Sequence, residues 1–189
     1  ALLSLSNLTD ERMRGAKTGA FWEQNPQRYL SNNSVCYTEK PDLGIFLKEW
    51  TNLYESKAGE RGIFARYACD KQIPNRRVDL AQNTPHLYGT NPCSEIILRS
   101  KQFCNLTEVI IRPGDSLPEL ANKVRLATIL GTIQSTYTNF RYLSAQWKKN
   151  TEEERLLGVS LTGIMDHDVM SGRSGEELLK NWLTQLKQE

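Results

Sequence analysis

The sequence predicts an α/β fold, and three observations support this prediction. Short apolar runs, such as Ile96–Leu98 and Val109–Ile111, are continuous rather than alternating, which is typical of strands covered on both faces. Longer segments, above all residues 118–137, carry apolar residues at steps of three and four and predict amphipathic helices. The two kinds of segment alternate along the chain, as they do in α/β layers and barrels.

Four helices are expected from periodicity and capping signals. The strongest runs roughly from Pro118 to Tyr137 and begins with a proline suited to the first helical turn. Its predicted apolar face consists of Leu120, Val124, Ala127, Leu130, Ile133 and Tyr137. The other three span about Thr9–Ala16, which opens with a capping signal, Asp42–Lys57, and Gly175–Leu186, which has acidic residues in its first turn.

The expected strands are short, and together they suggest an incomplete domain. They are Ala1–Leu5, Ser34–Tyr37, Gly62–Ala65, Ile96–Leu98, Val109–Ile111 and Val159–Leu161. Ala1 opens inside an apolar run, and Glu189 follows the last helix without a stop signal. Hydrophobic residues make up 39% of the 189 residues, which is low for a self-contained globular chain. We therefore expect residues 1–189 to be a piece of a larger domain.

Charge and hydropathy exclude several classes of partner. Lysine and arginine total 24 and aspartate and glutamate total 22, so the net charge of +2 gives no strong attraction to nucleic acid or to an anionic membrane. No apolar run approaches the ~20 residues that span a bilayer, and no basic, apolar signal peptide opens the chain. The sequence thus predicts a cytoplasmic protein with no nucleic-acid or membrane partner.

The cysteines and histidines do not form a recognisable metal site. No C-x-x-C pair exists, and His86 and His167 stand at no metal-ligand spacing from any cysteine. Cys36 and Cys69 are expected to be structural, because an unmodified cysteine usually behaves as a small buried hydrophobe. His167, between two aspartates, is expected in a solvated loop, since three adjacent side chains do not converge on one point.

The stretch NPCSEI, residues 91–96, places Asn91, Cys93 and Glu95 at alternate positions. In an extended segment these side chains would point to one side, ~6–7 Å apart. The carboxylate can take a proton from a hydroxyl, the amide can hold neighbouring hydroxyls, and the thiol can act as nucleophile, redox partner or radical carrier. On spacing alone, chemistry and ordinary packing of a buried cysteine stay equally open.

Two further sets of residues are candidates for the same site. Cys104 follows Cys93 by eleven residues and would approach it if the chain folded back as a hairpin between the two apolar runs. Three consecutive polar residues, Asn32, Asn33 and Ser34, either line a substrate site or form a polar turn at the entry of a strand.

NPCSEI followed by CNL resembles the finger-loop region of the catalytic subunit of ribonucleotide reductase. RYLSNNSVCY at 28–37, SKAGERGIFAR at 56–66 and ERLLGVSLTGIMD at 154–166 agree in order. Over nearly the whole chain the resemblance is to the adenosylcobalamin-dependent (vitamin B12) class. It implies part of a ten-stranded α/β barrel with a central finger loop. Residues 1–189 would be the middle of the catalytic barrel domain, without its effector-binding N-terminal and phosphate-binding C-terminal parts.

The resemblance also implies roles for the candidate residues. Cys93 matches the cysteine that becomes a thiyl radical and removes hydrogen from C3′ of the ribose. Glu95 matches the carboxylate that takes the 3′-hydroxyl proton, and Asn91 matches the amide that holds the ribose hydroxyls. Cys104 matches one of two reducing cysteines that end as a disulfide, and its partner lies outside this chain.

The implied reaction is the reduction of ribonucleotides, as triphosphates, to 2′-deoxyribonucleotides. Adenosylcobalamin would generate the radical, the remaining segments of the reductase would be partners, and a thioredoxin-like protein would be the reductant. Two alternatives stay open, namely the same reaction with a separate metal-containing radical subunit, and an inactive remnant or interaction module of that fold. The isolated chain is expected to be inactive.

Overall fold

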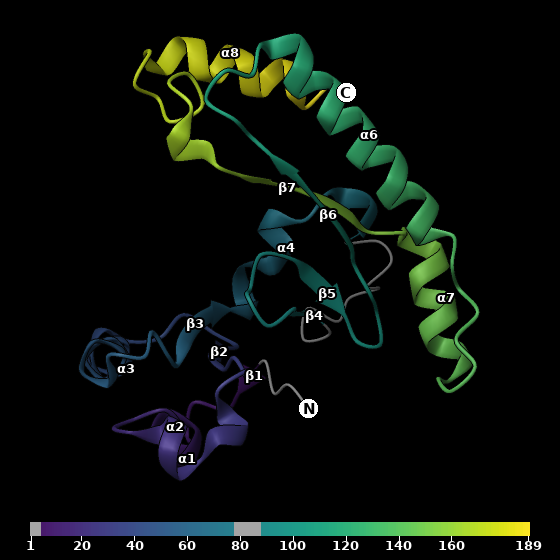
Figure 1. Ribbon diagram of the computed structural model, residues 1–189. Coiled ribbons are helices and arrows are strands. Elements are labelled where there is room, and N and C mark those ends of the chain that lie inside the picture. The colour runs from purple at the N-terminus through teal and green to yellow at the C-terminus, as the bar shows by residue number, and fades with distance from the viewer. Residues whose placement is uncertain (1–4, 78–87) are drawn as a thin grey trace. The chain divides into compact units, whose positions relative to one another are not determined.

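The computed structural model describes residues 5–77 and 88–189, apart from the side chain of Asp70. Most of the predicted strand Ala1–Leu5 and the histidine at position 86 therefore lie outside the described residues. The chain has a mixed α/β structure with small parallel and antiparallel sheets, which confirms the predicted fold class. It divides into two compact units, residues 1–100 and 101–189, which are described separately below (Figure 1).

The first unit is built on a three-stranded parallel sheet in the order β1–β2–β3. Its strands are β1 (Leu5–Ser6), β2 (Ser34–Tyr37) and β3 (Gly62–Ala65). Ser34 pairs with Gly62, so the loops that lead into β2 and β3 lie at the same edge of the sheet. The helical segments of this unit include α1 (Glu11–Arg14), α2 (Phe21–Gln24), η1 (Pro26–Arg28), α3 (Leu43–Ser56), η2 (Arg66–Ala68) and α4 (Cys69–Gln72).

An antiparallel hairpin, β4 (Tyr88–Thr90) and β5 (Ile97–Arg99), completes the first unit. Tyr88 is fully buried in an apolar cluster with Phe64, Cys69 and Ile73. This cluster joins the hairpin to β3 and α4, and its burial stabilises that junction.

Two arginine side chains also tie the hairpin to the first unit. Arg66 donates from Nε to the Tyr88 carbonyl at 2.6 Å, and Arg77 donates to the Ile97 carbonyl at 2.8 Å. Each strand of the hairpin therefore accepts a hydrogen bond from an arginine outside the hairpin, in addition to the bonds between the two strands. These contacts fix both ends of the loop that joins the strands.

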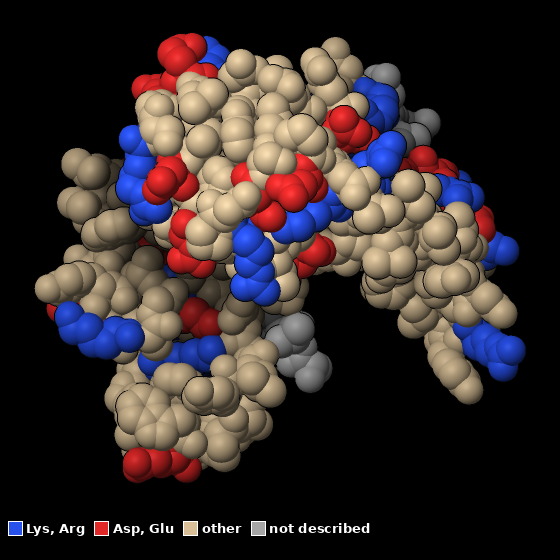
Figure 2. All heavy atoms as spheres, turned by 45° about the horizontal axis from the view of Figure 1, so that its top comes forward, with Lys and Arg blue, Asp and Glu red and all other residues tan. Residues whose placement is uncertain are grey.

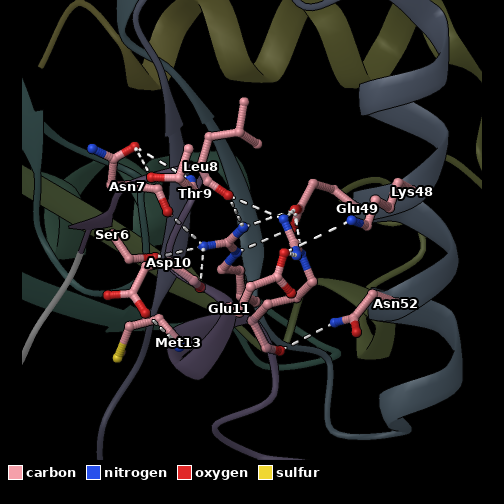
Figure 3. A network of polar contacts seen from close by, with 12 residues as sticks. Ser6, Asn7, Leu8, Thr9, Asp10, Glu11, Met13, Lys48, Glu49 and Asn52 are labelled. Carbon is pink, nitrogen blue, oxygen red and sulfur yellow. Dashed lines mark hydrogen bonds and ion pairs between the residues drawn. The ribbon is translucent and has the colours of Figure 1, made fainter.

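A buried ionic network links α3 to the sheet in the first unit (Figure 3). The Arg61 side chain is 0% exposed and the Glu49 side chain 1% exposed, and the guanidinium donates to both carboxylate oxygens at 2.7 and 3.1 Å. Arg14 donates to the same carboxylate from Nε at 2.6 Å. Arg61 also donates to the carbonyls of Asn7 and Leu8 at 2.9 and 3.2 Å, so its buried charge has both a counterion and acceptors.

The second unit has a two-stranded parallel sheet covered by helices. Strands β6 (Asn105–Ile110) and β7 (Leu157–Thr162) pair in register along their full lengths. In Figure 1, the long helix α6 (Leu117–Ser135) runs along these strands and α8 (Glu176–Leu186) lies beside α6. The remaining helical segments are α7 (Ala145–Glu154) and η4 (Ile164–Asp166). The buried core consists of Val109, Ile111, Leu120, Val124, Ala127, Met170 and Leu186.

Helix α6 buries a different stripe from the one predicted for its second half. Leu130 is 62% exposed, whereas Gly131 and Ser135 are buried. An α-helix has 3.6 residues per turn, so repeated steps of three residues after Ala127 move progressively away from the face that contacts the sheet. Gly131 also lets the helix lie close to β7, because a Cβ there would lie 2.2 Å from Leu157 Cδ1. The predicted inward position of Ile133 is wrong for the same reason, and that of Tyr137 is wrong because the helix ends at Ser135.

Several other elements match the sequence predictions, and the missed ones lack a periodic signal. Strands β2 and β3 have the predicted bounds, and the predicted helices at 9–16, 42–57 and 175–186 are present in shorter form. The sequence analysis missed α2, α4, α7 and β4. Helices of four residues are too short to show a period, and α7, with sequence AQWKKNTEEE, has no apolar face.

The prediction of a solvated loop at His167 is wrong. His167 is buried, and its Nε2 lies 2.8 Å from the Asp115 carbonyl oxygen. Its Nδ1 accepts from the backbone N–H groups of Val169 and Met170 at 3.1 and 3.2 Å. The imidazole therefore replaces backbone hydrogen bonds in a turn, which gives it a structural reason to be buried.

Charged side chains of both signs are interspersed on the face drawn in Figure 2, and neither sign covers a large area. Among the residues that the structure describes, no helix combines the length and the apolar character needed to cross a membrane.

Candidate active site

NPCSEI forms the loop of the β4–β5 hairpin, so the prediction of an extended segment is wrong. The Ser94 N–H donates to the Asn91 carbonyl at 3.0 Å, and Ser94 has a positive φ of 66°. Pro92, which follows Asn91, has no N–H to continue a strand ladder. The chain therefore turns at Pro92 and Cys93 instead of alternating its side chains along a strand.

Asn91 and Glu95 contact each other across the base of this loop. The Asn91 side chain donates to the Glu95 carboxylate, and its oxygen accepts from the Ile96 N–H at 3.1 Å. The carboxamide thus closes the loop and holds the carboxylate, while Glu95 itself stays exposed to solvent. The structure brings together two of the three predicted reactive groups.

Cys93 is exposed at the tip of the loop, on the wall of a polar cavity of about 380 Å³. The cavity is lined by residues 32–34, 58–60, 62–63 and 92–94, all within the first unit. Asn91 and Glu95 are not among the residues that line it. The turn therefore separates the thiol from the amide–carboxylate pair, which the predicted alternation would have kept on one side.

Asn33 and Ser34 lie at the start of β2 and line the same cavity as Cys93. Asn33 is 5% exposed and donates from Nδ2 to the Met13 carbonyl at 3.0 Å, whereas its buried Oδ1 has no hydrogen-bond partner. Ser34 lies close to Gly62, where a Cβ would lie 2.8 Å from Ser34 Oγ. These two residues are both the polar entry of a strand and part of the cavity wall, so the two interpretations left open by the sequence do not exclude each other.

Sequence reasoning named Asn32 together with Asn33 and Ser34, but it missed two polar residues beside this cavity, Glu60 and Lys17. Glu60 and Asn32 line it, and Lys17 donates to Glu60 Oε1 at 2.9 Å and also to the Ser31 carbonyl. A signal for Glu60 was present in the sequence, because Glu60 lies in one of the stretches that carry the family resemblance, at 56–66, as Asn32 does at 28–37. These stretches and NPCSEI are far apart in sequence and meet at one cavity.

Cys104 belongs to the second unit, directly before β6, and is half-buried. Its neighbour Phe103 packs against Trp147, with ring centroids 4.7 Å apart, and Asn105 N donates to the Leu156 carbonyl at 2.9 Å. The predicted hairpin between the two apolar runs is wrong, because β5 pairs with β4 while β6 pairs with β7. The chain around Cys104 is therefore fixed by contacts within its own unit.

The two cysteines predicted to be structural do pack in the first unit. Cys69 is buried in the apolar cluster that contains Tyr88, and Cys36 packs against that cluster. Burial raises the pKa of the Cys36 thiol above its ordinary value, although the positive charge of Arg66 opposes part of this shift. A raised pKa keeps Cys36 in the less reactive thiol form.

The arrangement can bind a small polyhydroxylated group beside a thiol. Amide, hydroxyl and backbone groups line the cavity and can exchange hydrogen bonds with hydroxyls, and Cys93 stands at its edge. Within residues 5–77 and 88–189, no three His, Cys, Asp or Glu side chains gather into a set that could hold a metal ion.

The chain is similar to an adenosylcobalamin-dependent ribonucleoside-triphosphate reductase from Lacticaseibacillus paracasei. The two are 32% identical over 142 residues, which cover 74% of this chain and 18% of that protein. The chain thus spans about a fifth of the length of the relative it matches. No protein-family model matches the chain, and no solved structure matches it.

Proposed function

We propose that this chain supplies the radical-cysteine region of a ribonucleotide reductase, which converts ribonucleoside triphosphates to 2′-deoxyribonucleotides. The observation that carries the proposal is the exposed thiol of Cys93 at the edge of a polar cavity built from three distant segments. Those segments are the ones that carry the resemblance, and the similarity to a ribonucleoside-triphosphate reductase supports the same reaction.

The size and lining of the cavity fit a sugar better than an apolar ligand. Its volume of about 380 Å³ is at the lower end of the range of small-molecule sites. Asn33 and Ser34 would exchange hydrogen bonds with ribose hydroxyls. Gly62 has no side chain to crowd the Ser34 hydroxyl, because a Cβ there would lie 2.8 Å from Ser34 Oγ. The buried Asn33 oxygen, which has no partner, is an acceptor that a small movement would make available to a hydroxyl.

In the proposed reaction the Cys93 thiyl radical takes a hydrogen atom from C3′, giving a thiol and a carbon radical. The Glu95 carboxylate accepts the 3′-hydroxyl proton, and Asn91 holds the hydroxyls. The 2′-hydroxyl leaves as water, and two thiols, one of them Cys104, supply two electrons and two protons and become a disulfide. Glu95 then returns its proton to the 3′-oxygen and Cys93 returns its hydrogen atom to C3′, so both the carboxylate and the thiyl radical are regenerated.

This assignment requires Asn91 and Glu95 to exchange their mutual hydrogen bond for contacts with the substrate. Both groups are at the base of the same loop as Cys93, and Glu95 is exposed. Hydrogen bonds of catalytic groups are often poorly aligned before the substrate binds and tighten in the complex. Substrate hydroxyls would replace the amide–carboxylate bond at little cost, because each partner keeps a hydrogen bond.

Adenosylcobalamin, the cofactor in the relative's name, is our proposed radical source. It would supply the initial hydrogen-atom abstraction from the Cys93 thiol. The cavity beside Cys93 does not fit it, because its lining is polar and its volume of about 380 Å³ suits a small ligand rather than a corrin. We therefore assign no residue of this chain to the cofactor.

The remaining machinery would come from other parts of the reductase. We propose that these parts complete a ten-stranded α/β barrel around the Cys93 loop and supply the second reducing cysteine opposite Cys104. A thioredoxin-like reductant would then reduce the disulfide for the next turnover. Closing the barrel would also exclude water from the thiyl radical, which the open cavity does not do.

The proposal can be tested with a chimaera in which this chain replaces the matching segment of the Lacticaseibacillus reductase. With adenosylcobalamin, a dithiol and a ribonucleoside triphosphate, the chimaera should form deoxynucleotide, measured by chromatography. Cys93→Ser should reduce product to background, because a serine hydroxyl cannot take the place of the thiyl radical.

Cys36→Ser is the matched control, since it makes the same change at a cysteine outside the cavity and should keep activity. A folded chimaera that keeps its activity with Cys93→Ser would contradict the role of Cys93. Activity without adenosylcobalamin would contradict the cofactor assignment. A chimaera that folds as the relative does but makes no product would instead favour an inactive remnant of the fold.

A further inference from the structure

A series of polar contacts leads from a largely buried ion pair to the Cys93 thiol. Lys17 and Glu60 have side chains only 9% and 14% exposed and form an ion pair at 2.9 Å. Lys17 Nζ also lies 5.5 Å from the centroid of the Phe21 ring, which helps to hold the ammonium in place. The Glu60 carboxylate therefore has a fixed position and a neutralising partner beside the cavity.

The Asn32 carboxamide connects Glu60 to Cys93. With its NH₂ group toward Ser31 and Glu60, it donates to the Ser31 carbonyl at 3.2 Å and to Glu60 Oε1 at 3.1 Å. The other end of the amide then lies 3.8 Å from Cys93 Sγ. The opposite orientation would set the amide oxygen against a carbonyl and a carboxylate, which are both acceptors, so the first orientation is favoured. Cys93 therefore faces an acceptor for its S–H group.

We propose that Lys17, Glu60 and Asn32 are positioning residues that orient the S–H group of Cys93 at the wall of the cavity. An amide suits the central place, because it alone of the small neutral side chains donates two hydrogen bonds and accepts others. Glu60 fixes which end of the amide faces sulfur, and Lys17 fixes Glu60. The catalytic importance of this positioning rests on the proposed function, whereas the contact between Asn32 and Cys93 is independent of it.

In the proposed reaction the S–H bond of Cys93 is broken and remade in every turnover. A fixed acceptor holds the sulfur and its hydrogen in one direction, which matters because misplacement of a reacting atom by about 1 Å is costly in rate. The three positioning residues would act on the rate of the chemical step rather than on substrate affinity. Its loss should lower kcat and leave the KM for the nucleotide unchanged.

The contact can be tested on the 189-residue chain by measuring alkylation of each cysteine with iodoacetamide, resolved by peptide mass spectrometry. Asn32→Ala should raise the rate at Cys93 about three- to tenfold, the usual worth of one hydrogen bond. Asn32→Asp should lower it, because a carboxylate beside the sulfur disfavours the reactive thiolate. Glu60→Gln should act like Asn32→Ala, since the amide is then free to turn.

The opposite directions of the two Asn32 variants separate positioning from simple disruption. Rates at Cys36 and Cys104 are internal references and should not change. Asn139→Asp, at an exposed asparagine of the second unit, is the matched control and should leave Cys93 unchanged. Equal acceleration by both Asn32 variants, or no change in either, would overturn the proposal.

A second measurement, in the chimaera, distinguishes this proposal from the proposed function. Asn32→Asp should lower kcat at least several-fold with an unchanged KM, and Asn32→Gln should restore part of the rate, because it keeps the amide. If the chimaera without substitutions makes no deoxynucleotide, the proposed function fails, while the alkylation rates still decide whether Asn32 positions the thiol. If it is active and Asn32→Asp changes KM alone, the positioning role fails.

Discussion

Different interactions stabilise the interior of each of the two units of this chain. In the first unit, the side chain of α3 that is most deeply buried is the carboxylate of Glu49, which two arginines contact. In the second unit, α6, α8 and the β6–β7 sheet pack around a cluster of buried apolar side chains. The cavity beside Cys93 lies in the first unit, where polar groups are already fixed by other polar groups.

This difference has a cost for the first unit. A buried ion pair is weak evidence for stability, because desolvation of the charges offsets most of their attraction, but removing one partner is strongly destabilising. An apolar core holds few charges that a substitution could remove, but it is sensitive to added volume, which forces side chains off their rotamers. The first unit should therefore respond most to loss of a charge, and the second to added volume.

The largest expected effect is that of Glu49→Gln in the first unit. It leaves two guanidinium groups in a buried place without their shared counterion. We expect a loss of about 3–5 kcal/mol in the free energy of unfolding. Hydrogen-exchange mass spectrometry should show faster amide exchange in β2, β3 and α3. Glu55→Gln, at an exposed position of the same helix, is the control, and an equal effect of both variants would contradict the importance of the network.

A smaller effect is expected for Gly163→Ala in the second unit. Gly163 has a φ of +77°, and a Cβ there would lie 2.4 Å from the backbone oxygen of Ile111. Gly172→Ala is the matched control, since Gly172 has a similar φ of +82° with only a distant side-chain atom at 3.8 Å. Gly163→Ala should cost about 1–3 kcal/mol more than Gly172→Ala in urea unfolding. Equal costs would show that the backbone conformation, rather than the contact with Ile111, limits this position.

The smallest expected effect is the pH dependence contributed by Asp115. A hydrogen bond from Lys123, at 2.5 Å, and one from the Arg112 N–H, at 2.8 Å, lower the pKa of Asp115 below its ordinary value. Because the folded pKa is the lower one, this stabilisation is present above the unfolded pKa and is lost as the pH falls through the folded pKa. Lys123 is 36% exposed, so solvent screens the pair and we expect about 1 kcal/mol or less.

Asp115→Asn should therefore flatten part of the loss of stability on acidification below about pH 4, as measured by urea unfolding at several pH values. The backbone carbonyl of residue 115, which His167 contacts, is kept in this variant. Asp168→Asn, at an exposed carboxylate, is the control. A steeper acid dependence in Asp115→Asn would show that the sign is wrong.

Local signals in the sequence predicted much of the fold, and they failed where local preference was weak. The capped helix after Ser116 was predictable, because its proline, glutamate and apolar steps all agree. Helix α7 was not, because a polar segment gives no periodic pattern and its helical state depends on tertiary packing. The NPCSEI loop was misassigned as extended, since alternation of residue types predicts a strand whether or not the segment has a pairing partner.

For the candidate site, the sequence by itself determined which residue types are available for chemistry. An amide, a carboxylate and two thiols were readable in NPCSEI and at Cys104. Only the tertiary structure decided which of them meet. It paired Asn91 with Glu95, turned Cys93 toward the loops that enter β2 and β3, and set Asn32 and Glu60 beside the thiol. Strand pairing joins residues far apart in the chain, so no local pattern specifies it.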